Sequence, residues 1–228
     1  RRFGIAFIDS DTVLEQRLNM PIRAFFEQFG EDVFREHETA VIDEGAIIGF
    51  GTKIWHFCHV MNSAKIGKDC ILGQNVMVAS NVEIGDSVKI QNNVSVYEGV
   101  TIEDDVFIGP SVVFTNIKNP RSFINRKSEF KATIIKKGAS IGANATILCG
   151  NTIGEYALIG AATVVTKDVK AYSLVVGNPM KHIGWVSEFG CNLNFNISDT
   201  AKCSESGQLY RLLDNQVFNL GDNSLNEG

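Results

Sequence analysis

The chain has 228 residues, of which 44% are hydrophobic, and its formal net charge is −5 at pH 7 with a pI near 5.4. This acidic balance argues against nucleic-acid binding, which needs a basic face, and no apolar run approaches the roughly 18 residues of a membrane span. No basic-then-apolar leader is evident, so we expect a cytoplasmic protein with no membrane insertion.

Residues 1–40 carry a pattern of their own and predict a short helical extension. Residues 3–8 form an apolar run typical of a strand, and Thr12–Glu15 has the spacing of a helix capping box. Residues 22–29 then place apolar side chains on one helical face.

The same segment resembles part of shikimate kinase through the stretches FIDSD and MPIRAFFEQFGEDVFREHE. The resemblance matches Asp9 and Asp11 to metal- and shikimate-binding aspartates and Arg35 to a shikimate-binding arginine. The Gly-rich phosphate loop and its lysine are absent. We interpret residues 1–40 as a kinase-like fragment without kinase activity.

A six-residue repeat follows. Every sixth residue is a branched aliphatic from Ile42 until Phe114 closes the run, and the repeat resumes from Ile135 to Val165. A fixed short period is typical of a solenoid, whereas the strands of a β-sandwich, the alternative, are spaced irregularly. The first run reads Ile42, Ile48, Ile54, Val60, Ile66, Leu72, Val78, Ile84, Ile90, Val96, Ile102, Ile108 and Phe114.

Small or β-branched residues stand two places before these aliphatics, as at Cys58, Val76 and Val94. Side chains alternate faces along a strand, so both columns point inward and the residue between them points outward. Gly, Asn and Asp follow, and these accept the positive φ of a tight corner. Each hexad therefore predicts one strand and one corner, and three hexads close a triangular coil about 4.8 Å tall. We assign this all-β parallel helix to residues 41–182.

The repeat is interrupted by an external loop at residues 115–133. Phe114 and Ile135 are 21 positions apart, which is not a multiple of six, so part of the segment must leave the coil. The loop is polar and carries Pro120, Arg121 and Arg126. Long loops on rigid scaffolds usually serve function, and a decorative insertion is the alternative.

The remaining residues show weaker patterns. Residues 183–190 are compatible with a short helix, and residues 191–228 are polar without clear periodicity. We expect a short helix and an irregular tail over 183–228.

The repeat and the stretches GAATVVTKDV and VVGNPMK resemble the hexapeptide acyltransferase family. The stretches IWHFCHV, LGQNVMV and KKGASIGANATILCG narrow the resemblance to its nucleotide-sugar N-acetyltransferases. The resemblance implies a left-handed β-helix, a homotrimer, acetyl-CoA as cosubstrate and a nucleotide-sugar substrate.

Three functions are considered, two from this family and one of another class. The motifs are most similar to enzymes that acetylate the 3-amino group of UDP-2-acetamido-3-amino-2,3-dideoxy-glucuronate for lipopolysaccharide O-antigen. An N-acetyltransferase acting on a dTDP-3-amino-3,6-dideoxyhexose is the enzymatic alternative. A non-catalytic or metal-binding β-helix trimer is the alternative of another class.

Coenzyme A needs a close approach to the backbone and cations for its phosphates. Small residues of the upper coils would let the pantetheine arm of coenzyme A lie close to the backbone. The alternative is that these residues serve only the tight packing of the coils. Two lysines would meet the phosphates, with a solvated surface as the alternative. The expected cofactor-binding residues are Gly142, Ala143, Gly160, Ala161, Ala162, Lys167 and Lys181.

Acetyl transfer to an amine needs a donor for the developing oxyanion and an acceptor for a proton. Asn116, at the loop root, is the first choice by family resemblance for an active-site residue. One coil contains 18 residues, so Glu98 is expected one coil beneath Asn116, and Tyr97 one coil beneath Thr115. The side chains of Glu98 and Tyr97 are therefore candidates for substrate binding. Asn93 at a corner is either a substrate contact or a turn residue.

Two loop arginines and one histidine are further candidates for substrate binding and catalysis. The guanidinium groups of Arg121 and Arg126 suit a diphosphate or a uronate carboxylate. His59 faces outward and is the rival catalytic base, although it lies three coils, about 14 Å, below Val113 in its own subunit. It could then act only across a subunit interface, and a substrate or interface contact and a structural role stay open.

We expect no metal site. His56 and His59 have the H-x-x-H spacing of a metal-binding pair, but neither a carboxylate nor a third ligand is evident. The five cysteines show no metal-ligand spacing.

Overall fold

The computed structural model describes residues 20–21, 23–24, 27–28 and 40–221. The chain divides into two units, residues 1–39 and residues 40–228. In the first unit the described residues 23, 24, 27 and 28 are helical. The expected strand at 3–8, the capping box and the kinase-like Asp9, Asp11 and Arg35 lie outside the described residues.

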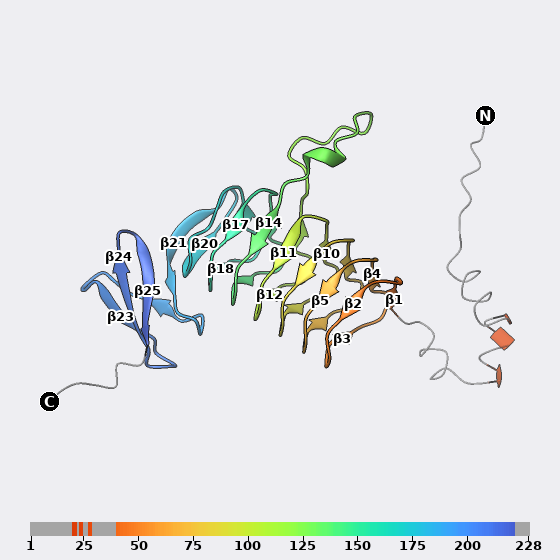
Figure 1. Ribbon diagram of the computed structural model, residues 1–228. Coiled ribbons are helices and arrows are strands. Elements are labelled where there is room, and N and C mark those ends of the chain that lie inside the picture. Colours follow the sequence, from red (N-terminus) through yellow and green to blue (C-terminus); the bar gives the residue numbers. More distant parts are fainter. Residues whose placement is uncertain (1–19, 22, 25–26, 29–39, 222–228) are drawn as a thin grey trace. The chain divides into compact units, whose positions relative to one another are not determined.

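The second unit is a left-handed parallel β-helix whose short strands stack into three sheets (Figure 1). The first sheet contains β1 (Val41–Ile42), β4 (His59–Val60), β7 (Met77–Val78), β10 (Ser95–Val96), β13 (Val113–Phe114), β16 (Thr146–Ile147) and β19 (Val164–Val165). The second contains β2 (Ile47–Ile48), β5 (Lys65–Ile66), β8 (Glu83–Ile84), β11 (Val100–Ile102), β14 (Thr133–Ile135) and β17 (Thr152–Ile153). The third contains β3 (Lys53–Ile54), β6 (Ile71–Leu72), β9 (Lys89–Ile90), β12 (Phe107–Ile108), β15 (Ser140–Ile141), β18 (Leu158–Ile159), β20 (Ser173–Val176), β21 (Lys181–Val186) and β22 (Asn192–Leu193).

The hexad aliphatics form the core, as the repeat predicts. From Val60 to Val165 each aliphatic of the register is buried, and the small residues two places before most of them are buried as well. The first coil is the exception, because β1 pairs with a strand on one side only, and Ile42 is 49% exposed there. The corners have the expected positive φ, for example 61° at Asn75 and 62° at Asn93.

The loop leaves the helix between β13 and β14, where Figure 1 shows it projecting from the coils. Val113 pairs with Thr146, 33 positions later, so 15 residues exceed one 18-residue coil at this point. Thr133 already belongs to β14, so the loop proper is residues 115–132. It contains the 3₁₀ turn η1 (Lys127–Glu129).

The expected short helix and irregular tail are wrong over residues 183–221, and residues 222–228 lie outside the described residues. β21 runs antiparallel to β20, and three further strands form a separate antiparallel sheet: β23 (Thr200–Lys202), β24 (Leu209–Leu213) and β25 (Gln216–Gly221). Asp214 and Asn215 both have positive φ and join β24 to β25 as a two-residue hairpin turn. The Asp-Asn pair between the stretches LYRLL and QVFNL was the available signal for this hairpin.

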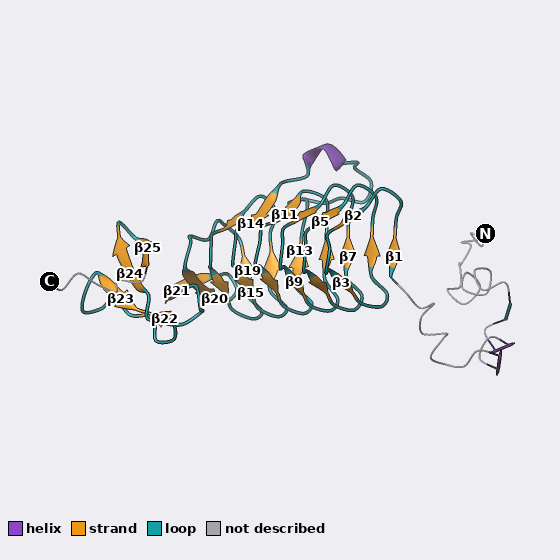
Figure 2. Ribbon diagram, turned by 60° about the horizontal axis from the view of Figure 1, so that its bottom comes forward, coloured by secondary structure: helices purple, strands orange, loops and turns teal. Residues whose placement is uncertain are grey.

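The sheet of β23–β25 lies beyond β21 and β22 at the end of the coils (Figure 2). An aromatic cluster anchors it to the last coils of the helix. The ring of Tyr172 stacks on Tyr156 at 5.5 Å and meets Tyr210 edge-on at 5.7 Å. The Tyr172 hydroxyl donates to Glu188 Oε1 at 3.2 Å, and Asn219 Nδ2 donates to the same oxygen at 2.7 Å. Burial, followed by the neighbouring Glu188 carboxylate, raises the pKa of Tyr172, which therefore remains a neutral donor.

None of the helical residues that the structure describes belongs to a segment with the length and apolar character needed to cross a bilayer.

The inward column yields a stability prediction. Ile141 is fully buried, whereas its neighbour Ser140 faces outward in the same strand. We expect Ile141→Ala to lower the free energy of unfolding by about 2–5 kcal/mol, because the coil cannot fill the cavity, and Ser140→Ala to change it by less than about 0.5 kcal/mol. Urea unfolding followed by circular dichroism measures both, and equal midpoints would contradict the inward assignment.

Candidate functional site

The root of the external loop is tied to the coils on either side of it. The carbonyl of Asn116 accepts a hydrogen bond from the amide of Lys131 at 3.0 Å, which closes the neck of the loop. Thr115 Oγ1 accepts one from the amide of Cys149, in the coil above, at 2.9 Å. The loop can therefore vary in sequence while its root keeps a fixed position.

Val113 pairs with Ser95, which shows the 18-residue stacking at this level. Continued past the end of β13, the same register carries Asn116 over Glu98. A Cβ on Gly99 would lie 3.5 Å from the carbonyl oxygen of Lys131, so the Tyr97–Gly99 corner touches the closed neck. The structure thus brings Asn116, Glu98 and the 40% exposed Tyr97 to one edge of the prism.

The two loop arginines have different surroundings. Arg126 Nη1 donates to both carboxylate oxygens of Glu129, at 2.8 and 3.0 Å, and its side chain is only 23% exposed. Arg121 is exposed and donates to the carbonyl of Pro120. Arg126 therefore holds the loop together, whereas Arg121 keeps its guanidinium available to a ligand.

His59 has a carboxylate partner that the sequence reasoning missed. His59 Nε2 lies 3.0 Å from Asp43 Oδ1, and Asp43 Oδ2 accepts the amide of Asn62 at 3.3 Å. Three successive strand pairings, His59 with Met77, Met77 with Ser95 and Ser95 with Val113, confirm that His59 lies three coils below Val113. Within one subunit the structure does not bring His59 to Asn116.

Asn93 lies at a different corner from Asn116. It follows β9, at the corner between the third and first sheets, whereas Asn116 and Glu98 lie between the first and second sheets. Its φ is 62°, and its Oδ1 accepts a hydrogen bond from Asn75 Nδ2 at 3.0 Å in the coil below. This geometry is that of a stacked turn residue.

The small residues of the upper coils occupy the corner of Asn93. A Cβ on Gly142 would lie 2.5 Å from the amide nitrogen of Ala161, and one on Gly160 would lie 2.7 Å from Val176 Cγ1. A Cβ on Gly109, one coil lower, would lie 2.7 Å from the amide nitrogen of Ala143. Coil stacking therefore requires these glycines, and Ala161 and Ala162 remain exposed at the same corner.

Lys167 and Lys181 line one cavity of about 680 Å³ near the last coil. Lys170, His182 and Trp185, which no sequence motif predicts, line it as well. Lys170 Nζ donates to the carbonyl of Asn215 at 2.9 Å. Burial, and secondarily the Lys170 charge, lower the pKa of His182. The cavity therefore presents lysine ammonium groups beside a neutral imidazole, which suits a phosphorylated ligand.

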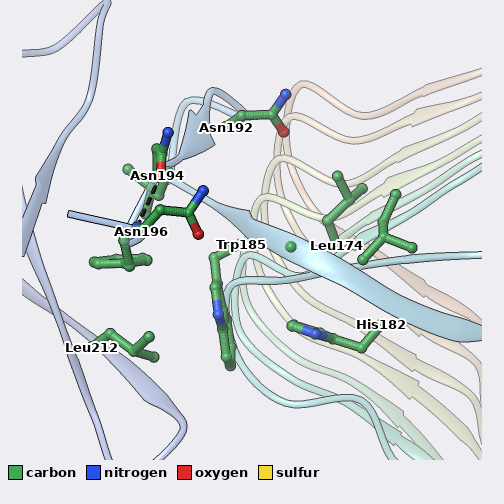
Figure 3. A pocket seen from close by; sticks show the side chains of 11 residues that line it. Leu174, His182, Trp185, Asn192, Asn194, Asn196 and Leu212 are labelled. Atoms are coloured by element: carbon green, nitrogen blue, oxygen red, sulfur yellow. Dashed lines mark hydrogen bonds between the residues drawn. The ribbon is translucent and has the colours of Figure 1, made fainter. Parts of the chain in front are cut away.

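A second cavity, of about 570 Å³, shares His182 and Trp185 with the first (Figure 3). Three asparagines at alternate positions, Asn192, Asn194 and Asn196, line it together with Leu174. Its lining residues carry no carboxylate, lysine or arginine, and none of them belongs to the site predicted from sequence.

Within the part of the chain that the structure describes, no group of three or more His, Cys, Asp or Glu side chains is arranged to hold a metal ion. The five cysteines are all free thiols.

Three segments of the chain match models of known protein families. The chain contains residues matching three family models: shikimate kinase over 1–47, the GMPPB C-terminal domain over 54–119, and the hexapeptide repeat of succinyl-transferase over 132–167. The first match agrees with the resemblance of the N-terminal segment. The other two fall on the β-helix, and the last of them is a hexapeptide repeat of an acyltransferase.

The chain aligns with nearly the whole length of one curated relative. The chain is 48% identical over 184 residues, 81% of this chain and 94% of the other, to dTDP-3-amino-3,6-dideoxy-alpha-D-galactopyranose 3-N-acetyltransferase of Aneurinibacillus thermoaerophilus. It is 41% identical over 85 residues to the bifunctional protein GlmU of Thermotoga sp. (strain RQ2), covering 36% of this chain and 18% of that one. The protein belongs to the hexapeptide-repeat acetyltransferase family and is an acyltransferase.

The fold has solved counterparts. A hexapeptide transferase family protein from Anaplasma phagocytophilum matches with a TM-score of 0.51 at 20% identity, over 66% of this chain and 81% of that chain. This likeness supports the β-helix architecture.

The loop geometry makes a prediction. Arg126→Ala removes the bidentate bond to Glu129, so we expect the loop to open more often and chymotrypsin to cleave after the 83% exposed Phe123 about two- to fivefold faster. Arg121→Ala is the matched control and should cleave at the wild-type rate. Equal rates for the two variants, measured by mass spectrometry of the fragments, would contradict the structural role of Arg126.

Proposed function

We propose that this protein is an acetyl-CoA-dependent N-acetyltransferase that acts on the 3-amino group of a dTDP-linked 3-amino-3,6-dideoxyhexose. The observation that carries the proposal is the 48% identity to the Aneurinibacillus thermoaerophilus enzyme over 94% of that enzyme. The UDP-linked 3-amino uronate for lipopolysaccharide O-antigen, which the motifs favour, becomes the second candidate. We further propose that the protein acts in the cytoplasm.

The positions of the predicted residues support a homotrimer. Asn116 and Glu98 lie at the corner between the first and second sheets, and Ala143 and Ala162 lie at the corner between the third and first. One triangular prism cannot bring two of its own corners together. A neighbouring subunit can, because its small-residue corner can face the loop root across a shared cleft. Substrate at one corner and coenzyme at the other would then meet between subunits.

In this arrangement each group has a defined task. The sugar amine attacks the thioester carbonyl, the C–N bond forms, the C–S bond breaks, and the amine proton leaves for an acceptor. The Asn116 amide can donate to the carbonyl oxygen or orient the amine, but it cannot take up the proton. Lys167 and Lys181, which share a cavity, would bind the coenzyme phosphates, and the exposed Arg121 would bind the nucleotide diphosphate.

Substrate choice is tested by turnover. The purified protein is incubated with acetyl-CoA and, separately, with the dTDP-3-amino-3,6-dideoxyhexose and the UDP-3-amino uronate, and release of the coenzyme thiol is followed. We expect kcat/KM to be at least about 100-fold higher with the dTDP sugar, because the wrong substrate leaves buried polar groups unpaired. Faster turnover of the UDP sugar would overturn the substrate assignment while leaving the reaction class intact.

The roles of Asn116 and His59 are separated in the same assay. Asn116→Ala should lower kcat by roughly 10²–10³, the usual cost of losing an oxyanion donor. His59→Ala should cost less than about tenfold, because His59 lies three coils lower and is bound to Asp43. A loss of about 10² or more in His59→Ala, with the assembly intact by size-exclusion chromatography, would instead identify His59 as the base acting from a neighbouring subunit.

A further inference from the structure

Glu98 has a different partner from the other carboxylates nearby. Glu83 is paired with Lys65 at 2.8 Å, and Glu103 with Lys136 at 2.6 Å. Among the ion pairs of the described residues, none includes Glu98. Its side-chain hydrogen bond comes instead from a neutral amide, Asn81 Nδ2, which donates to Glu98 Oε1 at 3.0 Å. The carboxylate is thus held in place without being neutralised.

The position of this carboxylate points to a ligand. Glu98 is exposed and lies 18 positions before Asn116, which is one coil in the register of the first sheet. It precedes Gly99, whose carbonyl accepts a hydrogen bond at 2.8 Å from the amide of Thr133, where the chain returns from the loop. Asn81 occupies one carboxylate oxygen, so Oε2 is left to accept hydrogen bonds. A 3-amino sugar in neutral water carries an ammonium group, and an exposed, unpaired carboxylate is the natural acceptor for it.

We propose that Asn81 is a positioning residue, which orients Glu98 so that its carboxylate binds the amino group of the sugar. Glu98 thereby sets the preference for an amino over a hydroxyl sugar, since a hydroxyl brings no positive charge. The inference rests on the proposed function and adds to it the anchor for the amine and the residue that holds that anchor.

A matched pair of variants tests the role of Asn81. Asn81 and Asn75 both have a φ of 61°, both are exposed, and both donate through Nδ2 to a residue of the next coil at 3.0 Å. They differ in the acceptor, which is Glu98 for Asn81 and Asn93 for Asn75. Glycine accepts this φ without strain, so Asn81→Gly and Asn75→Gly remove the amide at the same backbone cost.

We expect Asn81→Gly to raise KM for the amino-sugar nucleotide about tenfold, since it removes a hydrogen bond to a charged group, and to leave KM for acetyl-CoA within about twofold. Asn75→Gly should leave both constants within about twofold of the wild type. If the two variants behave alike while the wild type turns over, the inference is overturned and the proposed function stands. If the wild type acetylates no amino-sugar nucleotide, both are overturned.

Two further variants separate positioning from general stability. Glu98→Gln keeps an oxygen for Asn81 but removes the charge, so adding Asn81→Gly to it should raise KM by less than about twofold more. Asn81→Asp sets a second carboxylate beside Glu98, which raises the pKa of the pair, so the acid limb of kcat/KM should move to higher pH. Additive effects in the double variant, or an unmoved acid limb, would contradict the inference.

Discussion

The parallel stacking of one coil on the next is the interaction on which the rest of this structure depends. Strand pairs such as Ile108 with Ile141 repeat at every level of the third sheet, and the buried aliphatics fill the space inside the three sheets. Some corners tolerate this stacking only as glycine, since a Cβ on Gly67 would meet the backbone of the coil above. Backbone pairing, core and corner chemistry therefore constrain one another at each level.

This constraint determines where chemistry can be placed. The inward positions are committed to the core, so functional groups must stand on the outer faces, at the corners or on an insertion. The loop uses the third option, and its neck, closed between Asn116 and Lys131, returns the chain to register. Because the loop root and the small-residue corner lie at different edges of the prism, the proposed site depends on assembly as much as on folding.

The upper end of the helix is where this chain adds structure to the repeat. Tyr156 and Tyr172 continue from the coils into the aromatic cluster, and Glu188 binds groups from both sides of it. The sheet of β23–β25 is attached through that cluster, and the lysine-lined cavity lies next to it. The described residues after the last coil thus form a structured cap, with the lysine-lined cavity beside it.

The sequence alone determined the coils, the two inward columns, the corner residues, the loop and the stacking of Asn116 over Glu98. It could do so because each of these follows from a local six-residue period in which strand alternation decides which side chains point inward. The C-terminal sheet escaped prediction because its strands carry no such period, and their pairing, such as Thr200 with Arg211, follows no fixed spacing. The contacts of Asp43 with His59, of Asn81 with Glu98 and of Arg126 with Glu129 were decided by the tertiary structure, because they depend on side-chain orientation at corners and in a loop that no repeat specifies.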